Sequence, residues 1–343
     1  MIHKVLQRAE FEMQPPVLID VGASGGLHGA WKDLAKYSVC VAFDADDREM
    51  QVDAPESKAY RKLYIYNRAL TADKEGVADF YFTKEPACSS TLAPHADNLA
   101  AWEFAHRFAI VQRSTVQTMH LQTALRELKI EHVDWIKIDS QGTDLRLFQS
   151  LEALRMRRVL VAEFEPAIMD SYQGEDKLWQ LMASMDSLSF WMCDIDVKGS
   201  QRIRKNVMGA FRPFERKYLV HLLKSAPGWA EVTYFNAFAN PDFRLREYLL
   251  GWVCATIKEH HGFALELAIT AKERFRDTFC EELEQHSIRS IRRRYWNLPA
   301  YLPLLGRVYR KWRKGKRHGN PTARLAMTMA ASSQPMPRGD ARD

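Results

Sequence analysis

Hydrophobic residues in the first half of the chain form short continuous runs, separated by segments with helical spacing. The runs are rich in β-branched and aromatic residues, so they predict buried strands. Between them, apolar residues three and four positions apart predict helices with one buried face. The predicted strands are 17–21, 39–43, 63–66, 135–138 and 159–164, with an extended piece at 80–82, and the predicted helices are 30–37, 121–128 and 147–154.

Strand–helix alternation of this kind favours an α/β fold with a mostly parallel sheet and helices on both faces. Beyond residue 166 the pattern weakens. Residues 190–193 and 232–235 are predicted to pair as antiparallel strands at the sheet edge, and 178–185 to form a helix. Further on, the apolar spacing predicts two helices, 245–257 and 263–283.

The tail after His318 contains few large apolar residues and has no periodicity. We therefore predict that residues 319–343 are disordered. A domain over 1–240 and a helical, basic extension over 241–318 account for the rest. The length of 343 residues agrees with one large domain and an appendage, or with two domains.

The formal net charge of +6 is unevenly distributed. Between His286 and His318 there are eleven basic residues and no acidic residue. The tail adds +1, which leaves residues 1–285 with a net charge of −6. The basic balance belongs to one segment and does not indicate that the main domain binds nucleic acid.

Composition argues against several classes of protein. Five cysteines without a C-x-x-C pair disfavour a disulfide framework or a zinc ribbon and fit reduced thiols in the cytoplasm. The longest apolar run, 249–257, is far shorter than the roughly 20 residues that cross a bilayer, and no signal segment is visible at the N-terminus. We therefore expect a cytoplasmic globular protein.

The first candidate site is a loop of small residues, DVGASGG, from Asp20 to Gly26. Small residues let a ligand approach the backbone at a helix N-terminus. Ser24 replaces the glycine that admits a pyrophosphate in the dinucleotide pattern G-x-G-x-x-G, which disfavours a nicotinamide dehydrogenase. A ligand without phosphates suits the loop better, with Asp20 either accepting from an ammonium or ordering the loop. A tight turn that binds nothing is the alternative.

The second candidate is Asp44, which ends the second predicted strand 22 residues after Gly22. An acidic residue about 20 residues past a glycine loop is placed to accept hydrogen bonds from both ribose hydroxyls. An exposed loop aspartate is the alternative for this residue alone. The pair of signals at this spacing favours a nucleoside site.

The third candidate is the strand that carries Lys137 and Asp139 and breaks at Gly142. Alternation puts both charged side chains on one face, and ligands of open α/β sheets lie at the carboxyl ends of strands. An unpaired charge in this strand would cost about 2–5 kcal/mol, so a functional role is favoured. A structural bridge between Lys137 and a carboxylate is the alternative.

Together these segments resemble the FkbM family of S-adenosylmethionine-dependent methyltransferases, over roughly residues 15–240. The family patterns D-x-G-A-N-x-G and K-I-D-x-x-G-x-E are similar to DVGASGG at 20–26 and KIDSQGTD at 137–144. Three further segments resemble the family: NRAL at 67–70, CSSTL at 88–92 and AEFE at 162–165.

The chain departs from the family pattern at three positions. Ser24 stands where the family has Asn, and Asp44 and Asp144 stand where Glu is commoner. Residues 240–343 have no counterpart in the family. These departures affect details of cofactor contact more than the fold.

The resemblance implies a class I methyltransferase fold, which is Rossmann-like with a seven-stranded sheet. It also implies methyl transfer from S-adenosylmethionine to a hydroxyl of a carbohydrate or polyhydroxylated metabolite, in glycan or secondary-metabolite biosynthesis. The cofactor-binding residues that it implies are Asp20, Gly22, Ala23, Ser24, Gly26, Asp44 and Ala69.

A hydroxyl acceptor must lose its proton as the new bond forms, and a carboxylate can take it. Asp139 is the first candidate for this base, with Lys137 beside it. Glu163 and Glu165, which share a strand face, are the second candidates. Clustered carboxylates could also hold a divalent cation, an option that we do not favour. A Glu163–Lys137 salt bridge is the structural alternative.

The acceptor is expected to contact the serine-rich loop that follows Cys88. Ser89 and Ser90 could form hydrogen bonds with a polyol, and Glu165 is a further candidate for binding the acceptor. Loop serines that only contact solvent are the alternative.

Residues 289–317 interleave basic and aromatic side chains. They could form an arm docked on the main domain, or bind an anionic membrane at its inner face. RNA binding is a third possibility, and nucleic acid is the partner that we expect least. The alternative functions are a methyltransferase for RNA or another small molecule that uses this segment, and a non-catalytic cofactor-binding scaffold.

Overall fold

The chain divides into two compact units, Met1–Glu284 and Gln285–Asp343. A computed structural model describes residues 1–23, 26–46 and 58–296. The described part of the second unit is the end of one helix. The predicted disordered tail lies outside the described residues, as does most of the basic stretch.

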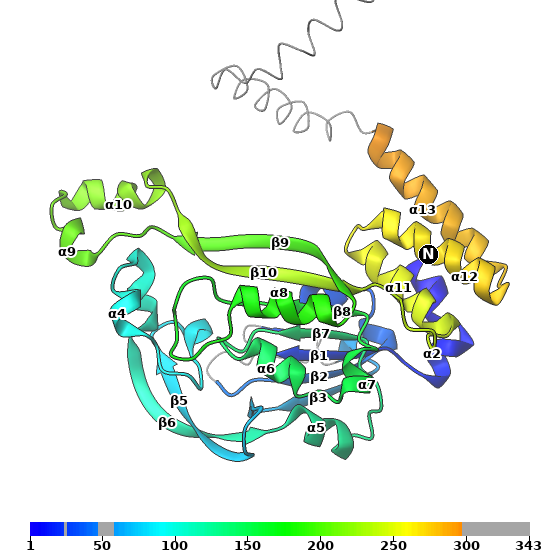
Figure 1. Cartoon of the computed structure of the whole chain (residues 1–343), viewed down its shortest axis with the longest axis horizontal. Helices are drawn as coiled ribbons and strands as arrows, with labels where there is room; N and C mark the ends of the chain where they lie inside the picture. Colours follow the sequence, from blue (N-terminus) through cyan, green and yellow to red (C-terminus); the bar gives the residue numbers. More distant parts are fainter. Residues whose placement is uncertain (24–25, 47–57, 297–343) are drawn as a thin grey trace, which may run out of the picture. The chain divides into compact units, whose positions relative to one another are not determined.

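Seven strands form one sheet in the first unit. Their order is β3-β2-β1-β7-β8-β10-β9, with the first five parallel and β10 antiparallel to both neighbours. The predicted mostly parallel sheet and the antiparallel pair at its edge are both confirmed (Figure 1). The strands are β1 (Val17–Val21), β2 (Val39–Phe43), β3 (Lys62–Tyr66), β7 (Trp135–Ile138), β8 (Val161–Phe164), β9 (Phe190–Ser200) and β10 (Ala226–Asn236).

A second, three-stranded sheet is inserted between β3 and β7. It consists of β4 (Ala69–Leu70), β6 (Ile110–Met119) and β5 (Gly76–Thr83), in that order. The sequence predicted only an extended piece around Phe80, because most of β6 is exposed and shows no apolar run. The β5–β6 pair is antiparallel and is followed on the β5 side by a short turn, η3 (Pro86–Cys88).

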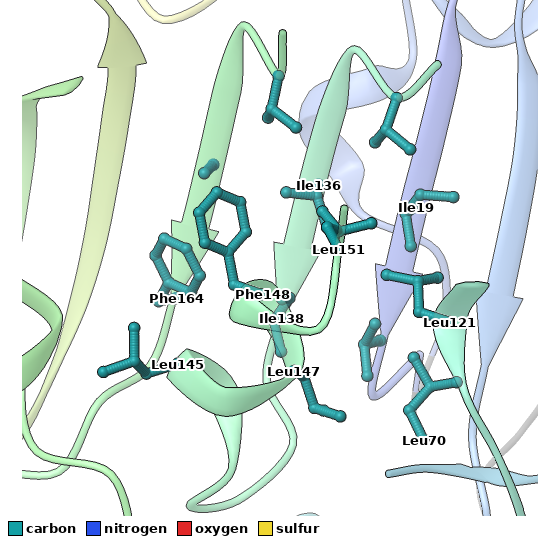
Figure 2. Packing of buried hydrophobic residues seen from close by; sticks show 14 of the residues in the cluster. Ile19, Leu70, Leu121, Ile136, Ile138, Leu145, Leu147, Phe148, Leu151 and Phe164 are labelled. Carbon is teal, nitrogen blue, oxygen red and sulfur yellow. The ribbon is translucent and has the colours of Figure 1, made fainter. Parts of the chain in front are cut away.

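Alternate residues of the central strands face two separate hydrophobic layers. Ile19 and Ile136 belong to one cluster, and their neighbours Leu18 and Trp135 belong to the other. Figure 2 shows the first cluster, in which Ile19 and Ile136 pack against helical leucines and Phe148. The helices of this layer are α5 (Leu121–Glu127), α6 (Asp144–Gln149), α7 (Ala153–Met156) and α8 (Leu178–Ser187).

The helices of the other layer come from the two ends of the first unit. Residues of α1, α2, α11 and α12 are buried with Leu18 and Trp135, so helices cover both faces of the sheet as predicted. These helices are α1 (Ile2–Leu6), α2 (Ala9–Met13), α11 (Leu245–Ile257) and α12 (His261–Phe275).

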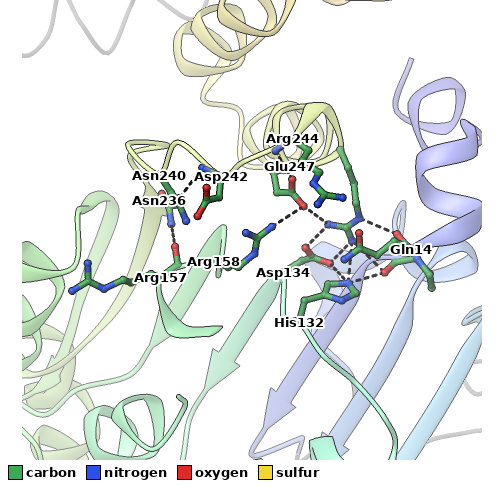
Figure 3. A network of polar contacts seen from close by, with 12 residues as sticks. Gln14, His132, Asp134, Arg157, Arg158, Asn236, Asn240, Asp242, Arg244 and Glu247 are labelled. Carbon is green, nitrogen blue, oxygen red and sulfur yellow. Dashed lines mark hydrogen bonds and ion pairs between the residues drawn. The ribbon is translucent and has the colours of Figure 1, made fainter. Parts of the chain in front are cut away.

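The first unit thus continues beyond the predicted boundary at residue 240, because α11 is buried along most of its length. Figure 3 shows a polar network that joins α11 to the sheet. Arg246 donates to Asp134, before β7, at 2.7 and 2.8 Å, and to the Gln14 carbonyl oxygen at 2.9 Å. Burial favours the neutral form of Asp134, but the Arg246 charge outweighs it and lowers the pKa of this carboxyl.

Three helix predictions are wrong in detail. The predicted helix 147–154 is divided between α6 and α7. Residues 30–37 form two 3₁₀ turns, η1 (Gly29–Trp31) and η2 (Ala35–Tyr37), instead of a continuous helix. The predicted helix 263–283 is divided between α12 and α13 (Phe279–Trp296), because Arg276 adopts a left-handed conformation that ends α12.

The remaining short elements lie near the cavity side of the first unit. They are α4 (Ala96–Leu99), η4 (Glu103–Phe108), α9 (Lys205–Met208) and α10 (Pro213–Leu222). None of the described helices is long and apolar enough to span a membrane. No disulfide joins the five cysteines, all of which lie in the described ranges.

Candidate active site

The last residues of β1, β2 and β7 are register partners, so the next residue of each strand lies at the same edge of the sheet. A cavity of about 220 Å³ opens there, bounded on the far side by residues of β4, β5 and η3. Sequence reasoning placed the site at the carboxyl ends of these strands. The predicted residues that line the cavity are Gly22, Asp44, Ala69, Ser89, Lys137 and Asp139.

Gly22 allows the ends of β1 and β7 to approach each other. Its φ is +78°, and a Cβ atom there would lie 2.0 Å from the Asp139 carbonyl oxygen. The Gly22 amide donates to the Phe43 carbonyl oxygen at 2.9 Å, which also ties the turn to β2. Glycine is therefore required by the backbone that shapes the cavity floor.

Asp20 orders the loop and does not line the cavity. Its side chain is only 1% exposed, and one carboxylate oxygen accepts from the His28 amide at 2.9 Å. Burial raises the pKa of Asp20. Ala23 and Gly26 are also absent from the cavity lining, and Ser24 lies outside the described residues.

Asp44 presents a buried carboxylate to the cavity. It is 9% exposed, and the Asp46 amide donates to its Oδ1 atom at 2.7 Å. Burial raises the pKa of Asp44 to about 6. No other hydrogen bond is recorded for this carboxylate within the described part of the chain, so Oδ2 can accept from a ligand.

Lys137 lies between two carboxylates. Its Nζ atom is 3.6 Å from Asp20 Oδ1 and 3.6 Å from Asp139 Oδ2, and it donates to the Gly22 carbonyl oxygen at 3.3 Å. Burial opposes its charge, but the two carboxylates outweigh burial and raise the pKa of Lys137. Lys137 therefore stays charged beside Asp139.

Comparison with known proteins identifies the domain that carries these residues. Residues 20–188 match the model of the methyltransferase FkbM domain. The chain contains an FkbM methyltransferase domain. It is a methyltransferase, and no curated protein matches it.

Among solved structures, two methyltransferases show distant similarity. One is precorrin-6y C5,15-methyltransferase from Geobacter metallireducens GS-15, with 10% identity, a TM-score of 0.29, and coverage of 69% of this chain and 87% of that chain. The other is named "StiE O-MT", with 11% identity, a TM-score of 0.31, and coverage of 76% and 79%. Similarity at this level does not bear on the substrate or the chemistry of this chain.

Asp139 of the FkbM domain is positioned by Gln141, which the sequence did not single out. The Gln141 side chain donates to Asp139 Oδ1 at 2.7 Å, and its own Oε1 lies 3.0 Å from the Tyr172 hydroxyl. Gln141 has a φ of +57°, in the left-handed region. Ser90 donates to the Gln141 carbonyl oxygen at 2.8 Å and is buried, so Ser90 supports this turn instead of lining the cavity.

Glu165 lies behind Asp139 and is not part of the cavity lining. Burial and the neighbouring Asp139 carboxylate raise the pKa of Glu165 well above its ordinary value. Glu165 therefore favours its protonated form at neutral pH. Asp144, the last residue of the KIDSQGTD motif, accepts from the Ser140 and Glu165 amides at 2.9 and 2.8 Å and joins the motif to β8.

The structure does not bring Glu163 to the cavity. Its carboxylate accepts from Trp135 Nε1 at 3.0 Å and lies 3.2 Å from His28 Nε2 and 3.4 Å from Lys258 Nζ. Burial favours the neutral form of Glu163, but these partners outweigh it and lower the pKa. The charged partners of Glu163 are therefore His28 and Lys258. The salt bridge to Lys137, considered from the sequence, is not the contact that Glu163 makes.

The cavity also contains residues that sequence reasoning did not select. Arg68 comes from the NRAL segment, in which only Ala69 was chosen, and Phe80 comes from the second sheet. The described residues contain no group of three or more His, Cys, Asp or Glu side chains arranged to hold a metal ion. The other lining residues with hydroxyl groups are Ser140, Thr91 and Thr143.

Proposed function

We propose that this methyltransferase transfers the methyl group of S-adenosylmethionine to a hydroxyl of a carbohydrate or another polyhydroxylated metabolite. The observation that carries the proposal is one cavity lined by carboxylates from the ends of two strands that flank β1. Asp44 lies at the end of β2 and Asp139 at the end of β7, with β1 between them. We assign the nucleoside to the first carboxylate and the acceptor to the second.

The residues of the cavity fit S-adenosylmethionine. Asp44 offers a buried carboxylate oxygen to the ribose hydroxyls. Gly22 and Ala69 are small lining residues and leave space in the cavity for the ligand. Phe43 stacks on Tyr66 with ring centroids 5.3 Å apart, which supports the β2 end from behind. When bound, S-adenosylmethionine supplies an electrophilic methyl group on a positively charged sulfur.

Asp139 is placed to take the acceptor proton. Gln141 binds its Oδ1 atom and Lys137 lies 3.6 Å from Oδ2, so the carboxylate has a fixed orientation. Glu165 favours its protonated form, so it adds no second negative charge next to Asp139. A carboxylate at this position can take the proton of the acceptor hydroxyl. A negative charge beside the cavity also favours a cationic donor.

The polar lining supports a polyol acceptor. Ser89, Thr91 and Thr143, which carry hydroxyl groups, line the same cavity as Asp139. Such groups both donate and accept hydrogen bonds, as sugar hydroxyls do. Glycan or secondary-metabolite biosynthesis is the setting that we propose for the reaction, in the cytoplasm.

The proposal is tested by following label from methyl-labelled S-adenosylmethionine into a panel of sugars, polyketide alcohols and RNA. We expect label in a hydroxyl-bearing small molecule, and about 10²–10⁴-fold less turnover in Asp139→Asn with unchanged affinity for S-adenosylhomocysteine. Transfer to RNA alone would contradict the acceptor assignment. Full turnover in Asp139→Asn would remove Asp139 from the role of base.

A further inference from the structure

The β9–β10 hairpin carries a basic, apolar tip over residues 201–225. Ser200 and Ala226 are the last register partners of the hairpin, and Val232 pairs with Phe164 at the carboxyl end of β8. The tip therefore projects beyond the sheet on the same side as the cavity. Figure 1 shows α9 and α10 at the end of this projection.

The tip exposes a stripe of large apolar side chains. Phe214, Tyr218 and Leu222 occupy positions i, i+4 and i+8 of α10, so they lie on one face of the helix. They are 61%, 58% and 79% exposed. Val207 on α9 and Leu223 after α10 are also exposed. Contiguous exposure of this kind marks an interaction surface.

The charge around the stripe is strongly positive. Residues 201–225 contain seven basic residues and one acidic residue, Glu215. Glu215 accepts from the Arg212 amide at 2.7 Å, so its carboxylate is used at the start of α10. In the part of the chain that the structure describes, no ion pair is recorded for the exposed cations Arg202, Arg204, Lys205, Arg212 and Lys224.

We propose that the tip, residues 201–225, binds the surface of an anionic lipid membrane. An anionic surface complements the cations, and a lipid interface accepts the aromatic and aliphatic side chains between them. A nucleic acid would satisfy the cations but would leave a leucine and a valine in water, because its surface is polar. A lipid surface is therefore the partner that accounts for both properties of the tip.

The orientation of the tip adds a consequence for the enzyme. Membrane contact at the end of the hairpin would place the cavity side of the sheet toward the lipid surface, where a lipid-linked or membrane-associated acceptor is available. This consequence rests on the proposed function. Lipid binding itself does not, because no cofactor or acceptor is needed for it.

The test is co-sedimentation of the full chain, without cofactor, with vesicles of phosphatidylcholine alone or of equal parts phosphatidylcholine and phosphatidylserine. We expect binding to the anionic vesicles only, weakened by salt. A triple variant, Arg204→Gln, Lys205→Gln and Arg212→Gln, should lose about a hundredfold in apparent affinity, since each basic residue contributes roughly fivefold.

A second variant removes the apolar stripe by Phe214→Ser, Tyr218→Ser and Leu222→Ser, and should also bind at least about tenfold more weakly. Its matched control changes Val77, Ile110 and Leu154 to Ser, which are 59%, 51% and 80% exposed elsewhere on the unit. The control should bind like the unmodified chain.

The basic stretch 289–317 is a separate predicted lipid contact, so one variant changes Arg289, Arg292 and Arg293 to Gln. The proposal is overturned if this variant abolishes binding while both tip variants bind normally. It is also overturned if the full chain binds no anionic vesicle, or binds a polyuridylate RNA through the tip and not the vesicle. None of these outcomes would contradict the proposed methyl transfer, because that reaction can be measured with a soluble sugar and without vesicles.

Discussion

At the scale of single residues, the space around Gly22 decides which side chain is possible there. Its Cβ position lies 2.0 Å from the Asp139 carbonyl oxygen, and its φ of +78° disfavours other residues. Gly22→Ala must therefore push the ends of β1 and β7 apart, at a cost of about 1–3 kcal/mol in the free energy of unfolding. Chemical denaturation measures this loss.

The control for this prediction is Gly262→Ala. Gly262 lies in α12 and has no atom within 4 Å of its Cβ position. Alanine is a better helix former than glycine, so stability should be unchanged or higher. Equal loss in both variants would show that the approach of β1 and β7 is not the cause.

Asp44 makes the stability of the folded protein depend on pH. Because burial raises its pKa from 3.8 to about 6, the folded state holds this proton more tightly than the unfolded state. Its contribution to stability is therefore largest below pH 3.8, falls as the pH rises to about 6, and is constant above that. Asp44→Asn should gain up to about 3 kcal/mol of stability at neutral pH.

The same group should control cofactor affinity in the opposite direction. Ribose hydroxyls donate to the ionised carboxylate, so affinity for S-adenosylhomocysteine should decline as the pH falls through about 6. Calorimetry of Asp44→Asn should give weaker binding by roughly tenfold or more and no such pH dependence. The exposed Asp79→Asn serves as control. A variant that binds as the unmodified chain does, with the same pH profile, would remove Asp44 from the ribose site.

Gln141 is a positioning residue for Asp139. Gln141→Met keeps the size of the side chain and removes the donor to Asp139 Oδ1. We expect kcat to fall about 10-fold to 100-fold with little change in affinity for S-adenosylhomocysteine. A fall in cofactor affinity of the same size, with kcat unchanged, would contradict this role.

Several site residues could be predicted and others could not. Asp44 and Asp139 follow strand ends, and a strand end is visible in sequence as the end of an apolar run. The contribution of Gln141 depends on a left-handed backbone and on Tyr172, which is distant in sequence. Glu163 was selected from its strand position, but the residues that cover it, such as Lys258, come from another helix layer.

At the scale of elements, the buried strands were predictable because their residues are continuous and apolar. The second sheet was not predictable, because most residues of β6 are exposed and β4 has only two residues. The tip at 201–225 was missed because its apolar residues are interleaved with cations and none of its described residues is buried. In each case the missing signal is burial, which periodicity reports only for elements that face a core.

The attachment of α11 to the sheet depends on the Arg246–Asp134 ion pair. Both side chains are almost fully buried, so Arg246→Leu removes the main cation beside a buried carboxylate and should cost about 3–5 kcal/mol in urea unfolding. Arg113→Leu breaks an ion pair of the same 2.7 Å length that is exposed, and should cost less than about 1 kcal/mol. A similar cost for both variants would contradict the importance of burial.

At the scale of the whole molecule, the family match over residues 20–188 identifies the methyltransferase domain, and α11 and α12 complete the core of the first unit. The −6 charge of residues 1–285 includes a strongly basic tip, so charge is distributed unevenly within the unit as well as along the chain. The net charge of the unit is therefore a poor guide to its partners, and the charge of the local surface beside the cavity is a better one.

The central claim is that one cavity at the ends of β1, β2 and β7 binds the methyl donor. The most direct measurement is a crystal structure of the protein soaked with S-adenosylhomocysteine. We predict the ribose hydroxyls within hydrogen-bond distance of Asp44, and the sulfur on the side of the cavity that faces Asp139. A nucleoside bound elsewhere, or a cavity that remains empty at saturating ligand, would contradict the account.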